Sequence, residues 1–351
     1  METTASKRIY SLDILRILAA FSVVLLHTTA SYMSGAAIDS STYRQALFVN
    51  SVSRYGVPFF VMISGIVFLC GTQEISYKKL WTHNIVRLFV IYIVWSSLYV
   101  AVDLLKGHTG KSISQIARDI INGKYHLWFL PMIMGIYVVL PLLKSWVDKA
   151  EKKEVEIFLA AFFALDLLIN AIGIINNGKS YTISTFTDKV SFPLGEYVGY
   201  FVMGYYLWTF GIKKGVRIFL YILTPVLVFV NYSLAYKQSL EFNSISLATA
   251  DCNSLLAFIE IIALFVFLCE IFKKYPVSEK SGRVLVNLSK STLGEYLVHL
   301  MVLEFLFPYI SKFTSIPVWL MSILEALLFF VISIIIAAVL RRIPKIGKYI
   351  C

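Results

Sequence analysis

Long, uninterrupted apolar stretches recur along this chain and constrain its fold more than any other feature of the sequence. Most are about 20 residues long, the length that an α-helix needs to cross a bilayer. Because the apolar residues run continuously instead of alternating with a period of two, they predict helices and not the strands of a membrane barrel. With 58% hydrophobic and only 15% charged residues, the chain also lacks the polar surface of a soluble protein. The sequence therefore predicts an all-α, polytopic integral membrane protein.

Polar breaks divide the 351 residues into about ten candidate transmembrane helices, which leave no room for a soluble domain of ordinary size. We therefore expect a single membrane domain over residues 1–351. The candidate at 191–210 begins with Pro193, Gly195 and Glu196, as expected of a broken helix that lines a cavity. The ten predicted spans are 10–31, 50–70, 84–105, 127–143, 155–175, 191–210, 216–236, 252–272, 291–310 and 317–340.

Lysine and arginine are distributed unevenly between the two sides of the predicted membrane. If the N-terminus faces the cytoplasm, the inner segments hold 21 basic residues and the outer segments hold 10. Since cytoplasmic loops collect basic residues, this bias predicts a multi-pass protein with both termini in the cytoplasm. The same rule accounts for the net charge of +11 without a nucleic-acid partner. The first span lacks a small-residue cleavage site after a short apolar core, so we interpret it as a retained helix.

The four cysteines show no paired spacing. Cys70, Cys252, Cys269 and Cys351 form neither a CxxC motif nor another pattern typical of a disulfide framework or a zinc site. We interpret them as packing residues and expect neither a metal nor a cofactor.

Three ionisable residues lie in the first predicted span, where insertion of Asp or Arg near a helix centre costs about 2.5–3.5 kcal/mol. Arg16 and His27 are separated by eleven residues, so they project from the same helix face about 16 Å apart along the axis. Asp13 lies three residues before Arg16, close enough to pair with it. A structural interpretation is also open, in which Asp13 and Arg16 form a snorkelling pair and His27 bonds a neighbouring helix.

Further polar residues mark the second, third and fourth spans. Ser64 and Gly65 allow close helix packing or a narrow passage past a ligand. Arg87 begins the third span and is either a topology anchor or a ligand-binding cation. His126 and Trp128 stand at a predicted outer boundary, where an interfacial aromatic belt is the default interpretation.

The ninth span begins with a short polar motif. Glu295 and His299 are four residues apart and therefore share a helix face. The pair predicts either a mutual salt bridge or two ligand-binding groups.

Together these motifs resemble the bacterial acyltransferase 3 family of integral membrane O-acyltransferases. In its first helix the family has an Arg, ten intervening residues and a His, often preceded by Leu-Asp, and the chain has Leu12-Asp13, Arg16 and His27. Residues 8–340 are similar to the family, most of all to the membrane-only branch that contains the O-acetyltransferase of enterobacterial common antigen. The other similar segments are 58–65 (PFFVMISG), 126–129 (HLWF) with Tyr137 and Pro141, and 294–299 (GEYLVH).

The chain departs from the family at one position. Many relatives carry two arginines three residues apart at the start of the third helix, whereas Asn84 stands three residues before Arg87. Lys78 and Lys79 are candidates to supply the missing charge.

The resemblance implies an acyl-CoA-dependent enzyme of the bacterial cytoplasmic membrane. Acetyl-CoA would be the co-substrate, and the acceptor would be a hydroxyl of a cell-envelope glycan or lipid-linked saccharide. His27 would be the general base and Asp13 would orient Arg16. The substrate-binding residues would be Arg16, Arg87, Ser64, Trp128, Glu295 and His299.

Two other function classes fit the same features. A secondary transporter or polysaccharide exporter would also have about ten helices and intramembrane charges, although the two halves of the chain show no corresponding broken segments. A membrane anchoring or sensing domain is the second alternative, because similar regions are fused to soluble enzymes in other proteins. Release of CoA from acetyl-CoA in the presence of an acceptor would distinguish an acyltransferase from a transporter.

Overall fold

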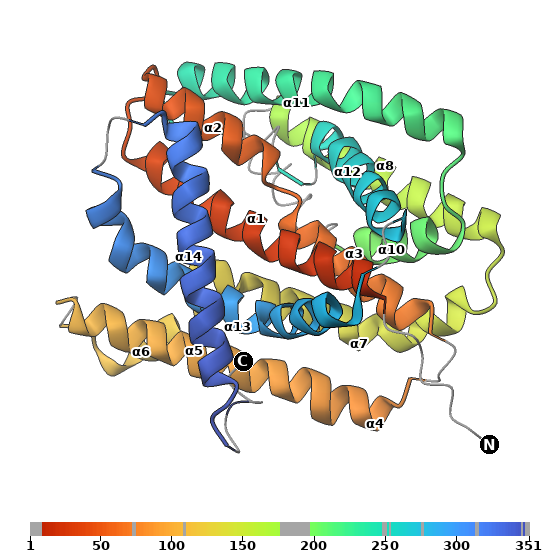
Figure 1. Ribbon diagram of the computed structural model, residues 1–351, viewed down its shortest axis with the longest axis horizontal. Coiled ribbons are helices and arrows are strands. Elements are labelled where there is room, and N and C mark those ends of the chain that lie inside the picture. Colours follow the sequence, from red (N-terminus) through yellow and green to blue (C-terminus); the bar gives the residue numbers. More distant parts are fainter. Residues whose placement is uncertain are drawn as a thin grey trace.

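The computed structural model describes residues 9–71, 75–107, 110–175, 197–247, 251–252, 254–274, 277–312, 316–344 and 347, with the side chains of 165–175 left out. All the regular elements within these residues are helices (Figure 1). Cys351, which the predicted topology places in the cytoplasm, lies outside the described residues. The helices are α1 (Tyr10–Ser34), α2 (Ser41–Val52), α3 (Gly56–Leu69), α4 (Tyr77–Lys79), η1 (Leu80–Ile85), α5 (Val86–Leu105), α6 (Ile113–Asn122), η2 (Tyr125–Trp128), α7 (Phe129–Val147), α8 (Lys152–Ile175), α10 (Val198–Thr209), α11 (Lys214–Phe242), α12 (Leu255–Lys274), α13 (Glu279–Ile310) and α14 (Val318–Leu340).

Eight stretches of the described residues are long and apolar enough to cross a bilayer. The prediction of an all-α polytopic membrane protein is therefore confirmed, although the count is lower than the ten spans expected. The two predicted spans not among the eight are those that coincide with α8 and α10. At 12 residues, α10 is about 18 Å long and too short to cross a bilayer alone.

The first helix, α1, lies near the centre of the helix bundle. It packs against α2, α3, α12, α13 and α14, so a side chain on almost any of its faces meets another helix. Figure 1 shows α1 crossing the middle of the molecule, with α11 along one edge and α5 and α6 along the opposite edge. This central position explains how a span can carry Asp13, Arg16 and His27 without exposing them to lipid.

The second span is broken, which the sequence did not predict. A single apolar stretch over Ser41–Leu69 forms two helices, α2 and α3, that are separated by a turn at Ser53, Arg54 and Tyr55. Non-helical backbone at membrane depth is tolerated only where protein or a polar cavity covers it. The break therefore marks a position enclosed by other elements.

Two glycines allow α3 and α10 to approach each other closely. A Cβ added at Gly65 would lie 1.8 Å from the backbone oxygen of Phe201, and one added at Gly204 would lie 2.1 Å from that of Met62. Only a residue without a side chain fits at such a contact. The packing interpretation of Gly65 is thus correct, whereas its neighbour Ser64 lines a cavity.

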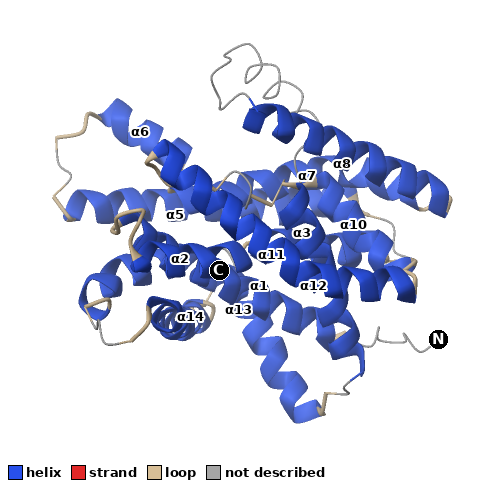
Figure 2. Cartoon of the chain, turned by 90° about the horizontal axis from the view of Figure 1, so that it is seen from above, coloured by secondary structure: helices blue, strands red, loops and turns tan. Residues whose placement is uncertain are grey.

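The chain between the predicted third and fourth spans folds back along α5. It contains α6, whose N-terminus has a complete capping box formed by Ser112 and Gln115. The Tyr92 hydroxyl of α5 donates to the backbone oxygen of Ile121 at 2.7 Å, which holds the end of α6 against the middle of α5. Figure 2 shows α6 beside α5 at the edge of the molecule. This hairpin carries the next segment, η2, into the helix bundle.

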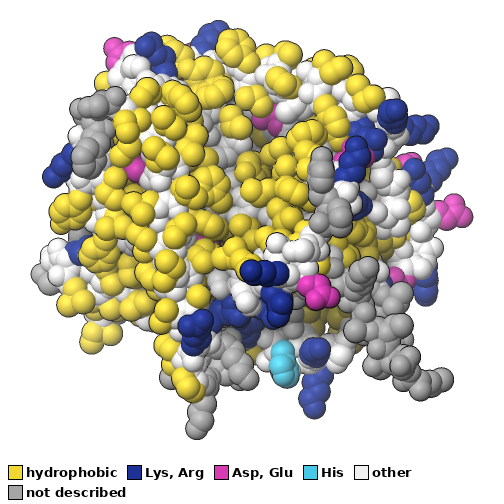
Figure 3. Space-filling model, viewed as in Figure 1, with side chains coloured by type: hydrophobic (Ala, Val, Ile, Leu, Met, Phe, Trp, Pro, Cys, Tyr) yellow, Lys and Arg dark blue, Asp and Glu magenta, His cyan; other side chains and the backbone are white. Residues whose placement is uncertain are grey.

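The surface has the distribution of side chains expected of a membrane protein. In Figure 3 hydrophobic side chains cover most of the visible face, and lysine and arginine gather at its margins. Phe219, Ile222 and Phe229 of α11 are also exposed, and that helix buries few of its own residues. Such a face is favourable in lipid and unfavourable in water.

Candidate active site

A cavity of about 360 Å³ brings together three residues that the sequence motifs singled out. Arg16 of α1, Ser64 of α3 and Arg87 of α5 all line it. The charges of Arg16 and Arg87 both act on Tyr137 of α7, so two guanidinium groups converge at one wall. These residues are up to 71 positions apart in the chain, and only the packing of α1, α3, α5 and α7 makes them neighbours.

A second cavity, of about 1000 Å³, adjoins the first. The two share Arg87, Tyr137 and Lys290 in their walls. The larger one is also lined by Asn84 and by Arg341, which follows α14. The adjoining cavities therefore carry at least four basic side chains, a surface suited to a polyanion such as a phosphate-bearing ligand.

Basic residues of other elements line the cavity that Asn84 also lines. Lys78 and Lys79, the candidates from the sequence, lie exposed on α4 and are in the walls of neither cavity. Lys290 of α13 and Arg341 are in the wall of the larger cavity together with Asn84. In the sequence both resemble ordinary topology anchors next to a span, so no local signal separates them from the other basic residues.

The smaller cavity also extends along α1 toward His27. Val23, which lies one helical turn before His27, is in its wall together with Tyr296 of α13. Arg16 and Val23 are seven residues apart, or about 10 Å along the helix axis. A ligand held at Arg16 can therefore extend toward His27 inside the protein.

Three histidines from three separate elements meet at that end. His27 of α1 stacks on His299 of α13, with ring centroids 5.3 Å apart. His126 of η2 meets His299 edge to face, also at 5.3 Å. Within the described residues, no group of three or more His, Cys, Asp or Glu side chains is arranged to hold a metal ion. The three rings are held by contacts with one another and with nearby tyrosines.

Hydrogen bonding fixes the proton arrangement of His299. Its Nδ1 lies 2.7 Å from the backbone oxygen of Tyr296. A carbonyl oxygen only accepts, so Nδ1 carries the hydrogen and the neutral ring keeps its lone pair on Nε2. Nε2 is buried without a hydrogen-bond partner among the described residues. His27, by contrast, is partly accessible, so it is the histidine of the pair that can meet a substrate.

The interfacial interpretation of His126 is wrong. Its side chain is only 2% exposed, and its backbone oxygen accepts a hydrogen bond from the Tyr296 hydroxyl. In the sequence, the HLWF motif was the signal that His126 belongs to the site. Its position next to a polar segment instead favoured a place at the membrane surface. The hairpin of α5 and α6 reverses that expectation, because it carries η2 into the bundle.

A network of ion pairs holds the chain just before His126. Lys124 lies 3.3 Å from Asp103 of α5 and 3.1 Å from Glu304 of α13. Glu304 also pairs with Lys106 at 2.8 Å. Because the network joins α5, α13 and the segment after α6, it stabilises the approach of η2 to the other two histidines.

The predicted pairing of Glu295 with His299 does not occur. The Glu295 side chain is 1% exposed, and neither of its carboxylate oxygens has a hydrogen-bond partner among the described residues. His299 instead bonds the backbone of its own helix. The shared helix face placed both groups in the bundle, but their side chains do not form a salt bridge.

Two other predicted residues lie apart from the histidine cluster. Asp13 is 2% exposed on α1, three residues before Arg16. Trp128 is 45% exposed, packs its ring 5.5 Å from that of Tyr197, and is in the wall of neither basic cavity. Its neighbour Tyr125 is 61% exposed and lies 5.5 Å from the His27 ring. Tyr125, directly before the HLWF motif, is therefore the aromatic residue that joins His27 to the surface.

Comparison with known proteins identifies the family of the chain. A model of the acyltransferase domain family matches residues 9–342, nearly the whole chain. No curated protein and no solved structure matches the sequence. The family match covers the two basic cavities up to Arg341 together with all three clustered histidines. On this basis the chain belongs to the acyltransferase family, and it is a membrane member of it.

Proposed function

We propose that the protein transfers an acyl group, acetyl in the simplest case, from cytoplasmic acyl-CoA to a hydroxyl of a cell-envelope glycan or lipid-linked saccharide. The observation that carries the proposal is the cavity that runs from Arg16, Ser64 and Arg87 to Val23, one turn before His27. It leads from a basic binding surface to within one helical turn of the proposed base. Membership of the acyltransferase family supports the reaction type.

The donor binds with its phosphates in the adjoining basic cavities. Arg16 and Arg87 act with Lys290 and Arg341, because several cations are needed to hold several phosphate charges. Asp13 orients Arg16 from the preceding turn of α1. The donor arm then extends along α1, which presents the thioester near His27.

His27 removes the proton from the acceptor hydroxyl. An imidazole suits this role because its ordinary pKa is about 6.5, and a positioned base contributes about 10²–10⁴-fold to the rate. His299 stacks against the ring and fixes its orientation. The acceptor approaches from the opposite side of the membrane, where exposed Tyr125 and Trp128 offer rings for a sugar.

The protein lies in the bacterial cytoplasmic membrane with both termini inside. The predicted 21-to-10 distribution of basic residues supports this orientation. It also places Lys290 and Arg341 on the cytoplasmic side, where acyl-CoA is available.

The direct experiment is acyl transfer by the purified protein in proteoliposomes. Acetyl-CoA is supplied on one side with an envelope glycan fraction, free CoA thiol is measured, and the glycans are analysed by mass spectrometry. The expected result is release of CoA that depends on the acceptor, with one acetyl group gained per CoA released. Movement of the saccharide without CoA release would identify a transporter and overturn the proposal.

A further inference from the structure

Arg54 is a charged residue at the break between α2 and α3, and the sequence motifs gave it no role. It lies within the Ser41–Leu69 stretch, where an arginine at membrane depth is unfavourable by about 2.5–3.5 kcal/mol unless the protein compensates. Its side chain is only partly accessible. A cation in this position needs a structural or chemical reason.

Asn50 fixes the guanidinium of Arg54. Its side-chain oxygen accepts hydrogen bonds from Nε at 3.2 Å and from Nη2 at 3.1 Å. The amide nitrogen of Asn50 donates to the backbone oxygen of Leu26 and to the hydroxyl of Thr29, both at 3.0 Å. Leu26 and Thr29 flank His27 on α1. A fully buried amide thus links Arg54 to the backbone beside the proposed base.

The charge of Arg54 acts on His27 as well as on Asp251. Among the described residues Arg54 forms no salt bridge, and its two hydrogen bonds to Asn50 involve Nε and Nη2. A guanidinium has five N–H donors, so this arrangement leaves Nη1 able to bind a further acceptor. Arg54 is therefore a fixed cation beside the histidine cluster.

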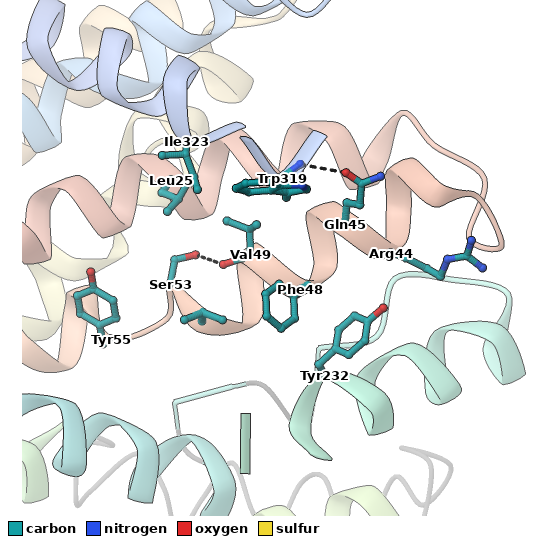
Figure 4. A pocket seen from close by; sticks show the side chains of 11 residues that line it. Leu25, Arg44, Gln45, Phe48, Val49, Ser53, Tyr55, Tyr232, Trp319 and Ile323 are labelled. Carbon is teal, nitrogen blue, oxygen red and sulfur yellow. Dashed lines mark hydrogen bonds between the residues drawn. The ribbon is translucent and has the colours of Figure 1, made fainter. Parts of the chain in front are cut away.

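The break also borders accessible space. Ser53 and Tyr55, the neighbours of Arg54 in the chain, line a cavity of about 620 Å³ between α1, α2, α11 and α14. Figure 4 shows Tyr55 at one end of this cavity and Arg44 at the other. The residues on both sides of Arg54 therefore border a cavity whose wall also includes Leu25 of α1.

We propose that Arg54 is a catalytic residue that binds the negative charge formed on the acyl carbonyl oxygen during transfer, and that Asn50 positions it. The inference rests on the proposed acyltransferase function. When His27 takes the proton of the acceptor hydroxyl, the acceptor oxygen bonds to the thioester carbon and the carbonyl π electrons move to its oxygen. Arg54 donates a charge-assisted hydrogen bond to that oxyanion. The C–S bond then breaks, the ester forms, and the CoA thiolate takes the proton from His27.

The main alternative is that Arg54 only neutralises Asp251. A set of four variants separates the two roles: Arg54→Gln, Arg54→Lys, Asp251→Asn and the double variant Arg54→Gln/Asp251→Asn. If Arg54 stabilises the oxyanion, Arg54→Gln lowers kcat by about 10²–10³-fold and leaves the KM for acetyl-CoA unchanged. The double variant then stays as slow as Arg54→Gln. If neutralisation is the role, removing both charges together restores turnover, and this result would overturn the proposal.

The lysine and asparagine variants test charge and geometry separately. Arg54→Lys keeps the charge but not the planar fork, so its kcat is expected to lie between those of the wild type and Arg54→Gln. Asn50→Ala keeps the whole guanidinium but removes its anchor, and it is expected to lower kcat with an unchanged donor KM. If thermal unfolding in detergent shows that Arg54→Gln does not fold, the kcat values of Arg54→Lys and Asn50→Ala test the role of Arg54 instead. Wild-type kcat in both would overturn the inference.

The matched control is Arg118→Gln, an exposed arginine on α6 that is in the wall of none of the three cavities. It is expected to keep wild-type kcat and donor KM. Failure of the inference and failure of the proposed function remain distinguishable, because the wild type is measured first. A wild type that transfers no acyl group contradicts the function, whereas an active wild type matched by Arg54→Gln contradicts only the role of Arg54.

Discussion

His27 and His299 stack ring on ring across the contact between α1 and α13, with centroids 5.3 Å apart. The bond of His299 Nδ1 to the Tyr296 backbone leaves its Nε2 as a buried acceptor, while His27 stays partly accessible. The two imidazoles are therefore not equivalent. One is held in a fixed tautomer inside the bundle, and the other can meet a substrate hydroxyl.

Replacement of His27 tests the assignment of the base. His27→Ala should lower kcat by at least about 10²-fold, because no other group would take the acceptor proton. His27→Asn should be nearly as slow, since an amide can hydrogen-bond but cannot act as a base near neutral pH. Acetylation rates in proteoliposomes, measured with thermal stability, check both variants. An active Asn variant would show that His27 only bridges helices.

Replacement of Arg16 tests the donor site. Arg16→Ala and Arg16→Lys should both raise the dissociation constant for acetyl-CoA, because an ammonium cannot reproduce the two-pronged contact of a guanidinium with phosphate. The measurement is titration calorimetry with acetyl-CoA in detergent. Arg118→Ala, on exposed α6, is the control and should bind normally. Equal affinity in wild type and Arg16→Ala would favour a structural role with Asp13.

Lys290 provides a separate test of the cavity, because nothing in the sequence marked it. It lines both basic cavities, so Lys290→Gln should weaken acetyl-CoA binding. Lys78→Gln removes a charge from exposed α4, outside both cavity walls, and should have little effect. Comparing the two dissociation constants checks the prediction. A larger effect at Lys78 would place the donor phosphates at α4 instead.

Gly65 should tolerate no side chain. Gly65→Ala places a Cβ 1.8 Å from the Phe201 backbone oxygen, which forces α3 and α10 apart at a cost of about 1–3 kcal/mol. The expected result is a lower unfolding temperature in detergent. Gly135→Ala on α7 is the matched control, since its Cβ meets nothing within 4 Å, and it should unfold at or above the wild-type temperature. Equal stability of both variants would contradict the close contact.

The orientation predicts opposite labelling of two segments. In a variant without native cysteines, a cysteine at Glu151 should react with an impermeant thiol reagent only from the cytoplasm. A cysteine at Gln115 on α6 should react only from outside. Intact and permeabilised cells provide the comparison. Labelling of both positions from one side would contradict the topology and the proposed side of donor binding.

The sequence by itself determined the fold class and the alignment of Arg16 and His27 on one face of α1. A long apolar run must become a helix in lipid, because only internal hydrogen bonds satisfy its backbone there. Helical periodicity then places Arg16 and His27 on one face, since eleven residues complete about three turns. Both conclusions depend only on interactions within one segment, and the order of residues in that segment determines those interactions.

The tertiary structure alone decided which residues of different helices meet. Lys290 and Arg341 reach the basic cavities, His126 reaches His299, and the break at Arg54 approaches His27 only because the helices pack in one particular arrangement. That arrangement depends on contacts such as Gly65 against Phe201 and on the hairpin of α5 and α6. In lipid the apolar faces of a helix are nearly equivalent, so hydrophobic periodicity does not specify its partners. Close packing and hydrogen bonds between distant segments specify them instead.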